Sequence, residues 1–160
     1  MNIVTAPEIL RGPEKPLVFL AGSIEMNTAI RWQDEVIKNL VHYSGTLLNP
    51  RRTAWDASWK QVASNPKFKE QVTWELNGIE QSDYVAFYFD PRTKSPVTLL
   101  ELGLALGLNK RIIIACPNGY WRKGNVDILA SRNSMIVHNS LSDLIRALQA
   151  VLTKHRKETS

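Results

Sequence analysis

Residues 95–110, SPVTLLELGLALGLNK, contain one acidic side chain, Glu101, within a run of leucine, alanine, glycine and valine. An ionised carboxylate is costly to remove from water unless it is paired or hydrogen-bonded. Pro96 is typical of the first helical position, so Glu101 should lie about one turn into a helix over residues 97–108, where the helix dipole favours an anion. Glu101 is therefore either a partly exposed acid that complements the dipole or a preorganised nucleophile or base.

Glu75, in FKEQVTWELNGIEQSD, is a second acid on an apolar stripe. Helical spacing places it on the same face as Val72 and Ile79. Such a glutamate can hydrogen-bond within the fold or lie at the edge of the stripe. Alternatively, Glu75 and Glu101 converge on one pocket and take separate roles. Glycosyl transfer needs such a pair, because one carboxylate acts as a nucleophile while the other assists the leaving group.

Two loops contain side chains suited to a sugar or a nucleobase. The turn AGSIEMN offers Gly22, Ser23 and backbone N–H groups ahead of a helix, which suits a phosphate or a sugar hydroxyl. The segment NPRRTAWDASW contains two tryptophans, which can stack on a nucleobase while Asp or Asn reads its polar edge. The tryptophans could equally pack the loop against the fold. The residues of this loop that we expect to bind a ligand are Asn49, Arg52, Trp55 and Asp56.

Short apolar runs alternate with longer segments of helical periodicity. The runs predict strands at 17–21, 46–49, 84–89, 111–115 and 135–138, and the periodic segments predict helices at 28–43, 68–79, 97–108, 126–133 and 140–153. Nearly continuous apolar strands separated by helices indicate a parallel sheet covered on both faces. We therefore expect an α/β fold with a five-stranded parallel sheet, three-layer, doubly wound and flavodoxin-like, in a single domain over residues 1–160.

The expected sheet also predicts where a ligand binds. In such folds the site lies beyond the carboxyl ends of the strands. The loops at 22–27, 50–66, 90–96 and 116–125 follow those ends, and they are rich in Gly, Pro, Trp, Asn and Arg. We therefore expect these loops to line the site.

The distribution of charge argues against binding to a nucleic acid polymer. The 160 residues have a formal net charge of +5, but the basic residues are scattered apart from Arg51–Arg52 and the tail TKHRKETS, which we expect to be frayed. A small anionic or polar ligand fits this pattern better. The three histidines, His42, His138 and His155, match no metal-ligand spacing, so we expect no metal.

The composition also bears on the cellular setting. No apolar run approaches the roughly 20 residues needed to span a bilayer, and the first residues do not resemble a signal peptide. A single cysteine, Cys116, allows no intrachain disulfide, which favours a reducing, cytoplasmic setting. We expect no membrane partner.

Four segments taken together carry a family resemblance. VFLAGSI, NPRRTAWDASW, EQVTWELNGIEQSDYVAFYF and SPVTLLELGLA occur in order between about residues 17 and 138, and they resemble the nucleoside 2-deoxyribosyltransferase-like family, in particular its bacterial and phage-type branch with NPRR and WE motifs. The resemblance implies a flavodoxin-like parallel sheet and cofactor-free transfer of a 2-deoxyribosyl group between nucleobases, or to water, through a glycosyl-enzyme intermediate on a glutamate. The implied partners are a nucleoside or nucleotide and a free nucleobase.

The resemblance also implies roles for particular residues. Glu101 matches the nucleophile, and Glu75 matches an acid that contacts and protonates the base. Gly22 and Ser23 match the ligand-facing turn after the first strand. Asn125, in RKGNVD, matches an Asn that reaches into a neighbouring subunit's site, which implies a homo-oligomer with shared active sites.

Some features depart from the family pattern and leave alternatives open. The segment LVFLAG lacks a Tyr that related transferases have in the first strand, and Ser95 stands where they carry an acid. These departures leave the preferred sugar and the balance of transfer against hydrolysis undetermined. One alternative is a nucleoside or nucleotide hydrolase in which Arg51 and Arg52 hold a 5′-phosphate. Another is a non-catalytic module that senses nucleotides on the same fold.

Overall fold

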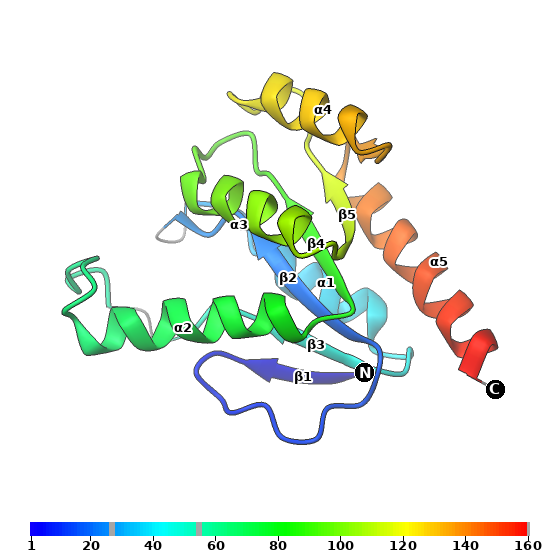
Figure 1. Ribbon diagram of the computed structural model, residues 1–160, viewed down its shortest axis with the longest axis horizontal. Helices are drawn as coiled ribbons and strands as arrows, with labels where there is room; N and C mark the ends of the chain where they lie inside the picture. Colours follow the sequence, from blue (N-terminus) through cyan, green and yellow to red (C-terminus); the bar gives the residue numbers. More distant parts are fainter. Residues whose placement is uncertain (26–27, 54–55, 160) are drawn as a thin grey trace.

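The computed structural model describes residues 1–25, 28–53 and 56–159, which form one six-stranded sheet and five helices (Figure 1). All strand pairs are parallel, and the strand order is β1-β3-β2-β4-β5-β6. The strands are β1 Asn2–Thr5, β2 Leu17–Gly22, β3 Thr46–Asn49, β4 Tyr84–Tyr88, β5 Arg111–Ala115 and β6 Val137–His138. The helices are α1 Trp32–Leu40, α2 Pro66–Gln81, α3 Pro96–Gly107, α4 Lys123–Arg132 and α5 Leu141–Thr159.

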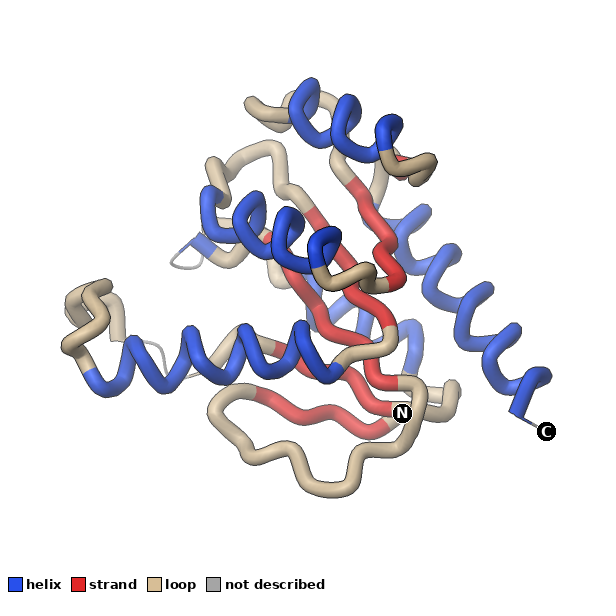
Figure 2. The backbone as a smooth tube through the Cα atoms, viewed as in Figure 1, coloured by secondary structure: helices blue, strands red, loops and turns tan. Residues whose placement is uncertain are grey.

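Helices cover both faces of the sheet, so the fold has three layers (Figure 2). In β2, Leu17 and Phe19 point to one face and pack in a core with α2, α3 and α4. Val18 and Leu20 point to the other face and pack in a second core with α1 and α5. Because both faces are buried, the central strands read as continuous apolar runs. The structure therefore confirms the expected flavodoxin-like α/β architecture.

The sheet has six strands, so the expectation of five was wrong. The missed strand, β1, pairs in parallel with β3 at one edge of the sheet. Its sequence, NIVT, is short and only half-buried, with Asn2 and Ile3 exposed. An edge strand of four residues lacks the apolar run by which the buried strands were recognised.

Most helix boundaries differ by one to three residues from those expected, and two differ by more. Helix α1 begins at Trp32 and not at residue 28, because residues 28–31 form a turn, a bend and irregular backbone. Helix α5 continues to Thr159, so the basic tail is helical and not frayed. The tail contains a Lys154–Glu158 pair one turn apart and basic residues in its last turn, which stabilise a helix C-terminus.

Gly78 allows α2 to lie close to the sheet. A Cβ atom at this position would come within 2.7 Å of two ring atoms of Phe19 in β2. Real carbon atoms do not approach that closely, so a side chain here would push the helix outward. The close packing holds the second half of α2, which includes Glu75, against Phe19 in the middle of β2.

Within the described residues, no helix is long and apolar enough to cross a membrane.

Candidate active site

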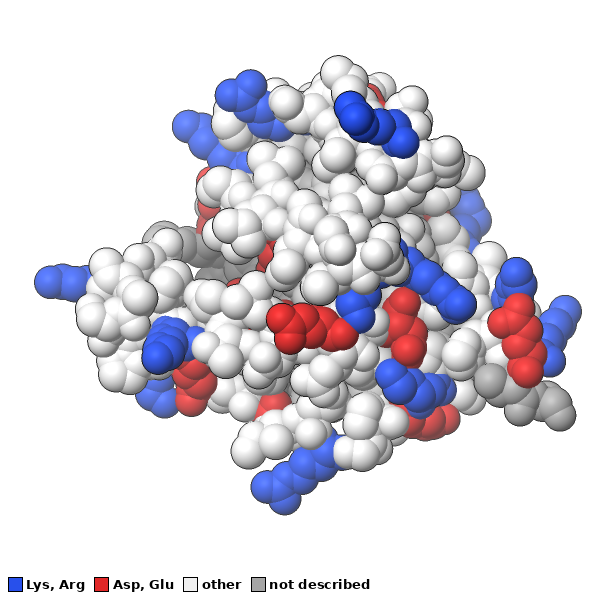
Figure 3. Space-filling model, viewed as in Figure 1, with Lys and Arg blue, Asp and Glu red and all other residues white. Residues whose placement is uncertain are grey.

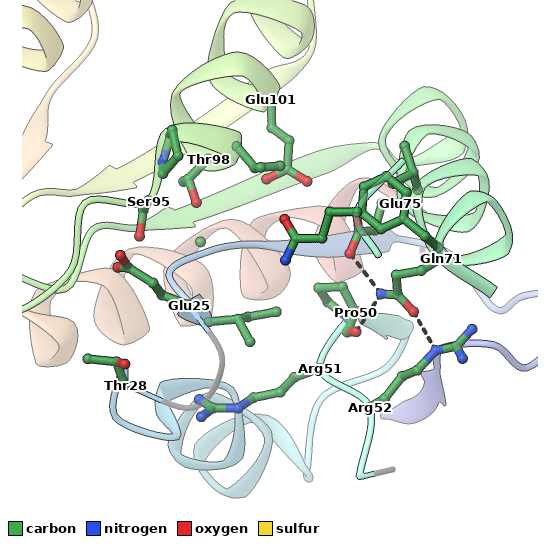
Figure 4. A pocket seen from close by; sticks show the side chains of 17 residues that line it. Glu25, Thr28, Pro50, Arg51, Arg52, Gln71, Glu75, Ser95, Thr98 and Glu101 are labelled. Atoms are coloured by element: carbon green, nitrogen blue, oxygen red, sulfur yellow. Dashed lines mark hydrogen bonds between the residues drawn. The ribbon is translucent and has the colours of Figure 1, made fainter. Parts of the chain in front are cut away.

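A cavity of about 560 Å³ lies beyond the carboxyl ends of the central strands, between α2, α3 and the turn after β2 (Figure 4). Its volume is in the range of small-molecule sites. The expected loops 22–27, 50–66 and 90–96 contribute to it, whereas no described residue of 116–125 does. The described lining residues are Gly22, Ile24, Glu25, Thr28, Pro50, Arg51, Arg52, Gln61, Phe68, Gln71, Val72, Glu75, Ser95, Pro96, Val97, Thr98 and Glu101.

The structure brings Glu101 and Glu75 to this cavity from neighbouring helices. Ser95 precedes α3 with a left-handed φ of 45°, and Pro96 occupies the first helical position, so the loop after β4 turns directly into the helix. Glu101 follows one turn later and is only 6% exposed. Glu75 projects from α2 on the side that faces the sheet end. Two acids that are distant in sequence therefore face one cavity.

Burial raises the pKa of both carboxyl groups. It raises the pKa of Glu75 to about 7, although a hydrogen bond from Gln71 and the charge of Arg52 act in the opposite direction. Burial also raises the pKa of Glu101 well above its usual range, and the negative charge of Glu75 raises it further. Since each carboxylate disfavours charge on the other, the pair retains a proton near neutral pH. A pair in this state can supply one nucleophile and one acid.

Gln71 connects Glu75 to a guanidinium group. Its Nε2 donates to Glu75 Oε1 at 2.7 Å and to the Pro50 carbonyl at 2.8 Å, while its Oε1 accepts from Arg52 Nε at 2.5 Å. Arg52 also donates to Glu70 Oε2 at 2.7 Å. Because a donor already binds the Gln71 oxygen, the amide can present only N–H to Glu75. This arrangement fixes the position of the Glu75 carboxylate.

Three hydroxyl groups meet behind the start of α3. Ser95 Oγ lies 2.6 Å from Ser23 Oγ and 2.7 Å from Thr93 Oγ1, and Thr93 Oγ1 lies 2.9 Å from Ser23 Oγ. Ser23 also accepts from the backbone N–H of Asp90 at 2.9 Å. Ser23 is fully buried and is not among the described lining residues, whereas Ser95 and Gly22 are. Ser23 thus supports Ser95 from behind.

The other residues expected from the sequence lie mostly outside the cavity. Asn49 is buried, and its Oδ1 accepts from the backbone N–H of Arg51 at 3.0 Å. Asp56 is exposed and accepts from Ser58. Asn125 is exposed on α4 and does not line the cavity of its own chain. Trp55 lies outside the described residues. For all four, ligand binding stays a prediction.

The cavity also contains residues that the sequence did not single out. Phe68 and Val72 had been assigned to the apolar stripe of α2, but this end of the stripe extends past the sheet and lines the cavity. Glu25 belongs to the AGSIEMN turn, and Thr98 to the first turn of α3. The helical period identified the right face of each helix, but it could not distinguish core positions from cavity positions. In the part of the chain that is described, no group of three or more His, Cys, Asp or Glu side chains is placed to hold a metal.

Comparison with known sequences finds one family model that matches the segment containing the cavity. Residues 15–120 match a family model described as nucleoside 2-deoxyribosyltransferase like. The matched segment runs from the start of β2 to the loop after β5 and includes every described lining residue of the cavity. A search of curated proteins found no match.

The buried carboxyl pair should reduce stability at high pH. Both pKa values are raised on folding, so between pH 4.5 and about 7 the folded protein binds more protons than the unfolded chain, and the free energy of unfolding falls as pH rises. Glu101→Gln should therefore stabilise the protein at pH 8, by on the order of 1–3 kcal/mol, and much less at pH 4. Urea denaturation at both pH values measures this, with exposed Glu80→Gln as the control. Lower stability of Glu101→Gln at pH 8 would contradict it.

Replacing Gln71 should raise the pKa of Glu75 further. Gln71→Met has a similar length but no N–H donor, so the ionised form of Glu75 loses a hydrogen bond. We expect an upward shift of about one pKa unit in the carboxyl titration of Glu75, followed by ¹³C NMR. Gln81→Met, on the exposed end of the same helix, should leave that titration unchanged. An unchanged pKa in Gln71→Met would show that this hydrogen bond does not control Glu75.

Proposed function

The chain belongs to the nucleoside 2-deoxyribosyltransferase-like family, and from this we propose that it cleaves the N-glycosidic bond of a (deoxy)nucleoside and transfers the sugar to another nucleobase. The observation that carries the proposal is the pair of carboxyl groups, buried Glu101 and half-buried Glu75, at one cavity of a size suited to a nucleoside. Two carboxyl groups that share one proton can supply the nucleophile and the general acid that a retaining glycosyl transfer requires.

In the first step, the carboxylate of Glu101 attacks C1′ of the sugar. The bond between C1′ and the base nitrogen breaks, the electron pair leaves with the base, and Glu75 gives its proton to the base. The sugar is then an ester of Glu101. A second base, deprotonated by Glu75, attacks C1′ and releases Glu101, so configuration is retained overall. The oxocarbenium-like transition states are stabilised by the nearby negative charge.

The proton must lie on Glu75 when the reaction starts. Within the protein alone, Gln71 and Arg52 favour charge on Glu75, and the Glu101 carboxylate has no donor among the described residues, so the proton resides on Glu101. A nucleobase nitrogen that accepts a hydrogen bond at Glu75 favours a protonated Glu75. Binding of the base thereby transfers the negative charge to Glu101, next to C1′.

The apolar wall on the α2 side suits the base. Phe68 is the one aromatic side chain among the described lining residues, and Val72 and Pro50 lie on the same side of the cavity. Apolar walls with an aromatic ring bind planar heterocycles by burial and stacking. We assign the base to this wall, where its polar edge reaches Glu75.

A second copy of the chain would complete this site. The outer face of α3 is apolar: Val97, Leu100 and Leu108 are 59%, 64% and 41% exposed, and the surface over α3 is largely uncharged (Figure 3). Exposed apolar surfaces of this kind are typical of interfaces. Val97 belongs both to this face and to the cavity rim. We propose a homo-oligomer in which Asn125 of one subunit reaches the sugar bound in another.

Deoxynucleoside donors incubated with free bases should yield new nucleosides, detected by chromatography. Glu101→Ala should lower the rate at least about a thousandfold, and Glu75→Gln by about 10²–10⁴-fold with the largest loss for poor leaving groups. A slow fluorinated donor should leave its sugar on the peptide that contains Glu101, seen by mass spectrometry.

Omitting the acceptor base and measuring free sugar tests the hydrolase alternative. Equal inactivity of the wild type and Glu101→Ala over a broad panel would exclude the enzyme, and ligand-induced thermal stabilisation without turnover would then favour a sensing module.

Shared sites can be tested by mixing inactive variants. Glu101→Ala and Asn125→Ala should each be inactive, but in a mixed dimer one of the two sites has both residues. Subunit exchange should therefore restore up to about a quarter of wild-type activity. Light scattering gives the oligomer mass, and Leu100→Asp should lower it. A fully active monomer, or no recovery on mixing, would contradict shared sites.

A further inference from the structure

The side-chain amide of Gln71 has one allowed orientation, because groups outside α2 hold it from two sides. Gln71 is 5% exposed. Its Nε2 donates to the Pro50 carbonyl at 2.8 Å, and its Oε1 accepts from Arg52 Nε at 2.5 Å. A reversed amide would place its oxygen against the Pro50 oxygen and its N–H groups against the guanidinium, so two hydrogen bonds would be lost. The amide therefore keeps Nε2 toward Glu75.

Arg52 is itself fixed in the position from which it orients this amide. Its side chain is only 7% exposed. Its Nη2 donates to Glu70 Oε2 at 2.7 Å, and its guanidinium carbon lies 5.8 Å from the centre of the ring of half-buried Trp59. A planar guanidinium that is bound at one nitrogen and packed on an aromatic ring has its remaining donors in set directions. Arg52 thus presents Nε to Gln71 without rearrangement.

The orientation of the amide makes the two oxygens of Glu75 different. Oε1 accepts from Gln71 Nε2 at 2.7 Å, whereas no described residue donates to Oε2. A protonated carboxyl group that is bound to an N–H donor keeps its carbonyl oxygen at the donor and carries its hydrogen on the other oxygen. Since Glu75 lines the cavity, the hydrogen on Oε2 is the one that a ligand can accept.

No other cation at the cavity is placed to do this. The charged side chains among the described lining residues are Glu25, Arg51, Arg52, Glu75 and Glu101. Arg51 donates to two backbone carbonyls, and Figure 4 shows its guanidinium directed away from Gln71. The charge of Arg52, in contrast, lowers the pKa of Glu75, against the larger effect of burial. Arg52 therefore acts on Glu75 both through its charge and through the amide.

Glu25, the third acid at the cavity, lies outside this network. Its Oε2 accepts from the backbone N–H of Lys94 at 2.7 Å. The carbonyl of Lys94 in turn accepts from Tyr120 Oη at 2.7 Å and from Trp121 Nε1 at 2.8 Å, which fixes this loop. Figure 4 shows Glu25 across the cavity from Glu75. A change at Arg52 should therefore affect Glu75 without moving Glu25.

We propose that Arg52 is a positioning residue, which acts through Gln71 to place the transferable proton of Glu75 on Oε2, where a nucleobase nitrogen can accept it. Arg52 then acts on the acid and not directly on the substrate. Without Arg52, the Gln71 oxygen loses its donor, and a rotated amide can bind the Glu75 proton itself. This inference rests on the proposed function for the role of Glu75, and it adds the residue that controls the acid.

The network can be tested by NMR in the protein without substrate. In the wild type, the side-chain amide resonances of Gln71 should shift with the carboxyl titration of Glu75, and Arg52 Nε–H should exchange slowly with water. Arg52→Met removes a donor and a charge, so it should raise the pKa of Glu75 by about one unit and reduce the Gln71 shift. Arg52→Lys retains one donor and the charge and should keep both near wild-type values. The exposed control Arg146→Met should change neither.

Kinetics tests whether this position of the proton matters for the reaction. Arg52→Met should lower kcat about tenfold or more for donors with poor leaving groups, while KM and the rates of good leaving groups change little. Arg52→Lys should restore most of the lost rate, because a lysine can again donate to the Gln71 oxygen. A residue that only packs the loop would lower the rate for all donors and would not be rescued by lysine.

The outcomes separate this inference from the proposed reaction. Slow exchange at Arg52 and a Gln71 amide that follows Glu75 support it in the wild type, even if Arg52→Met does not fold or no sugar is transferred. Gln71 resonances that do not follow Glu75, an unchanged titration in Arg52→Met, or equal effects of the Met and Lys variants would overturn it. A loss of kcat that is the same for all leaving groups would overturn it as well, while the assigned bond cleavage would stand.

Discussion

The free-energy cost of keeping two carboxyl groups out of water governs this site. Glu101 is almost fully buried, and Glu75 receives one side-chain donor, from Gln71. The nearest positive charge, on Arg52, is shared with Glu70 and reaches Glu75 only through the Gln71 amide. These contacts therefore do not fully offset the free-energy cost of burying the two carboxylates, and binding a proton near neutral pH lowers that cost. The buried pair lowers the stability of the fold, and it also retains the proton that the proposed reaction transfers.

The parallel sheet makes this arrangement possible. Helices α2 and α3 precede and follow β4, and both pack on the same face of the sheet. Their cavity ends meet above the carboxyl ends of the strands, where irregular loops replace regular backbone. Gly78 lets α2 approach β2, and Pro96 starts α3 directly after the loop. The positions of α2 and α3 thus determine the distance between the carboxyl groups of Glu75 and Glu101.

The sequence predicted the buried parts well and the half-buried parts poorly. Strands 46–49 and 111–115 were predicted with the observed bounds, because buried strands are continuous apolar runs. The edge strand β1 and the helical C-terminal tail were missed, since neither has an apolar run. At the cavity, the helical period identified Glu75, and the isolated charge identified Glu101. Glu25 and the Gln71 amide were not found, because their positions depend on contacts with loops distant in sequence.

The two hydrogen bonds to the Lys94 carbonyl, from Tyr120 and Trp121, separate the chain into two parts with different freedom to evolve. Every described lining residue falls between Gly22 and Glu101, so no described residue of α4, β6 or α5 lines the cavity of its own chain. Sequence drift in the last quarter of the chain can therefore proceed without altering bond-breaking residues. A chain that changes its subunit contacts must still keep Tyr120 and Trp121, which anchor Lys94, together with Asn125, which the proposed oligomer uses.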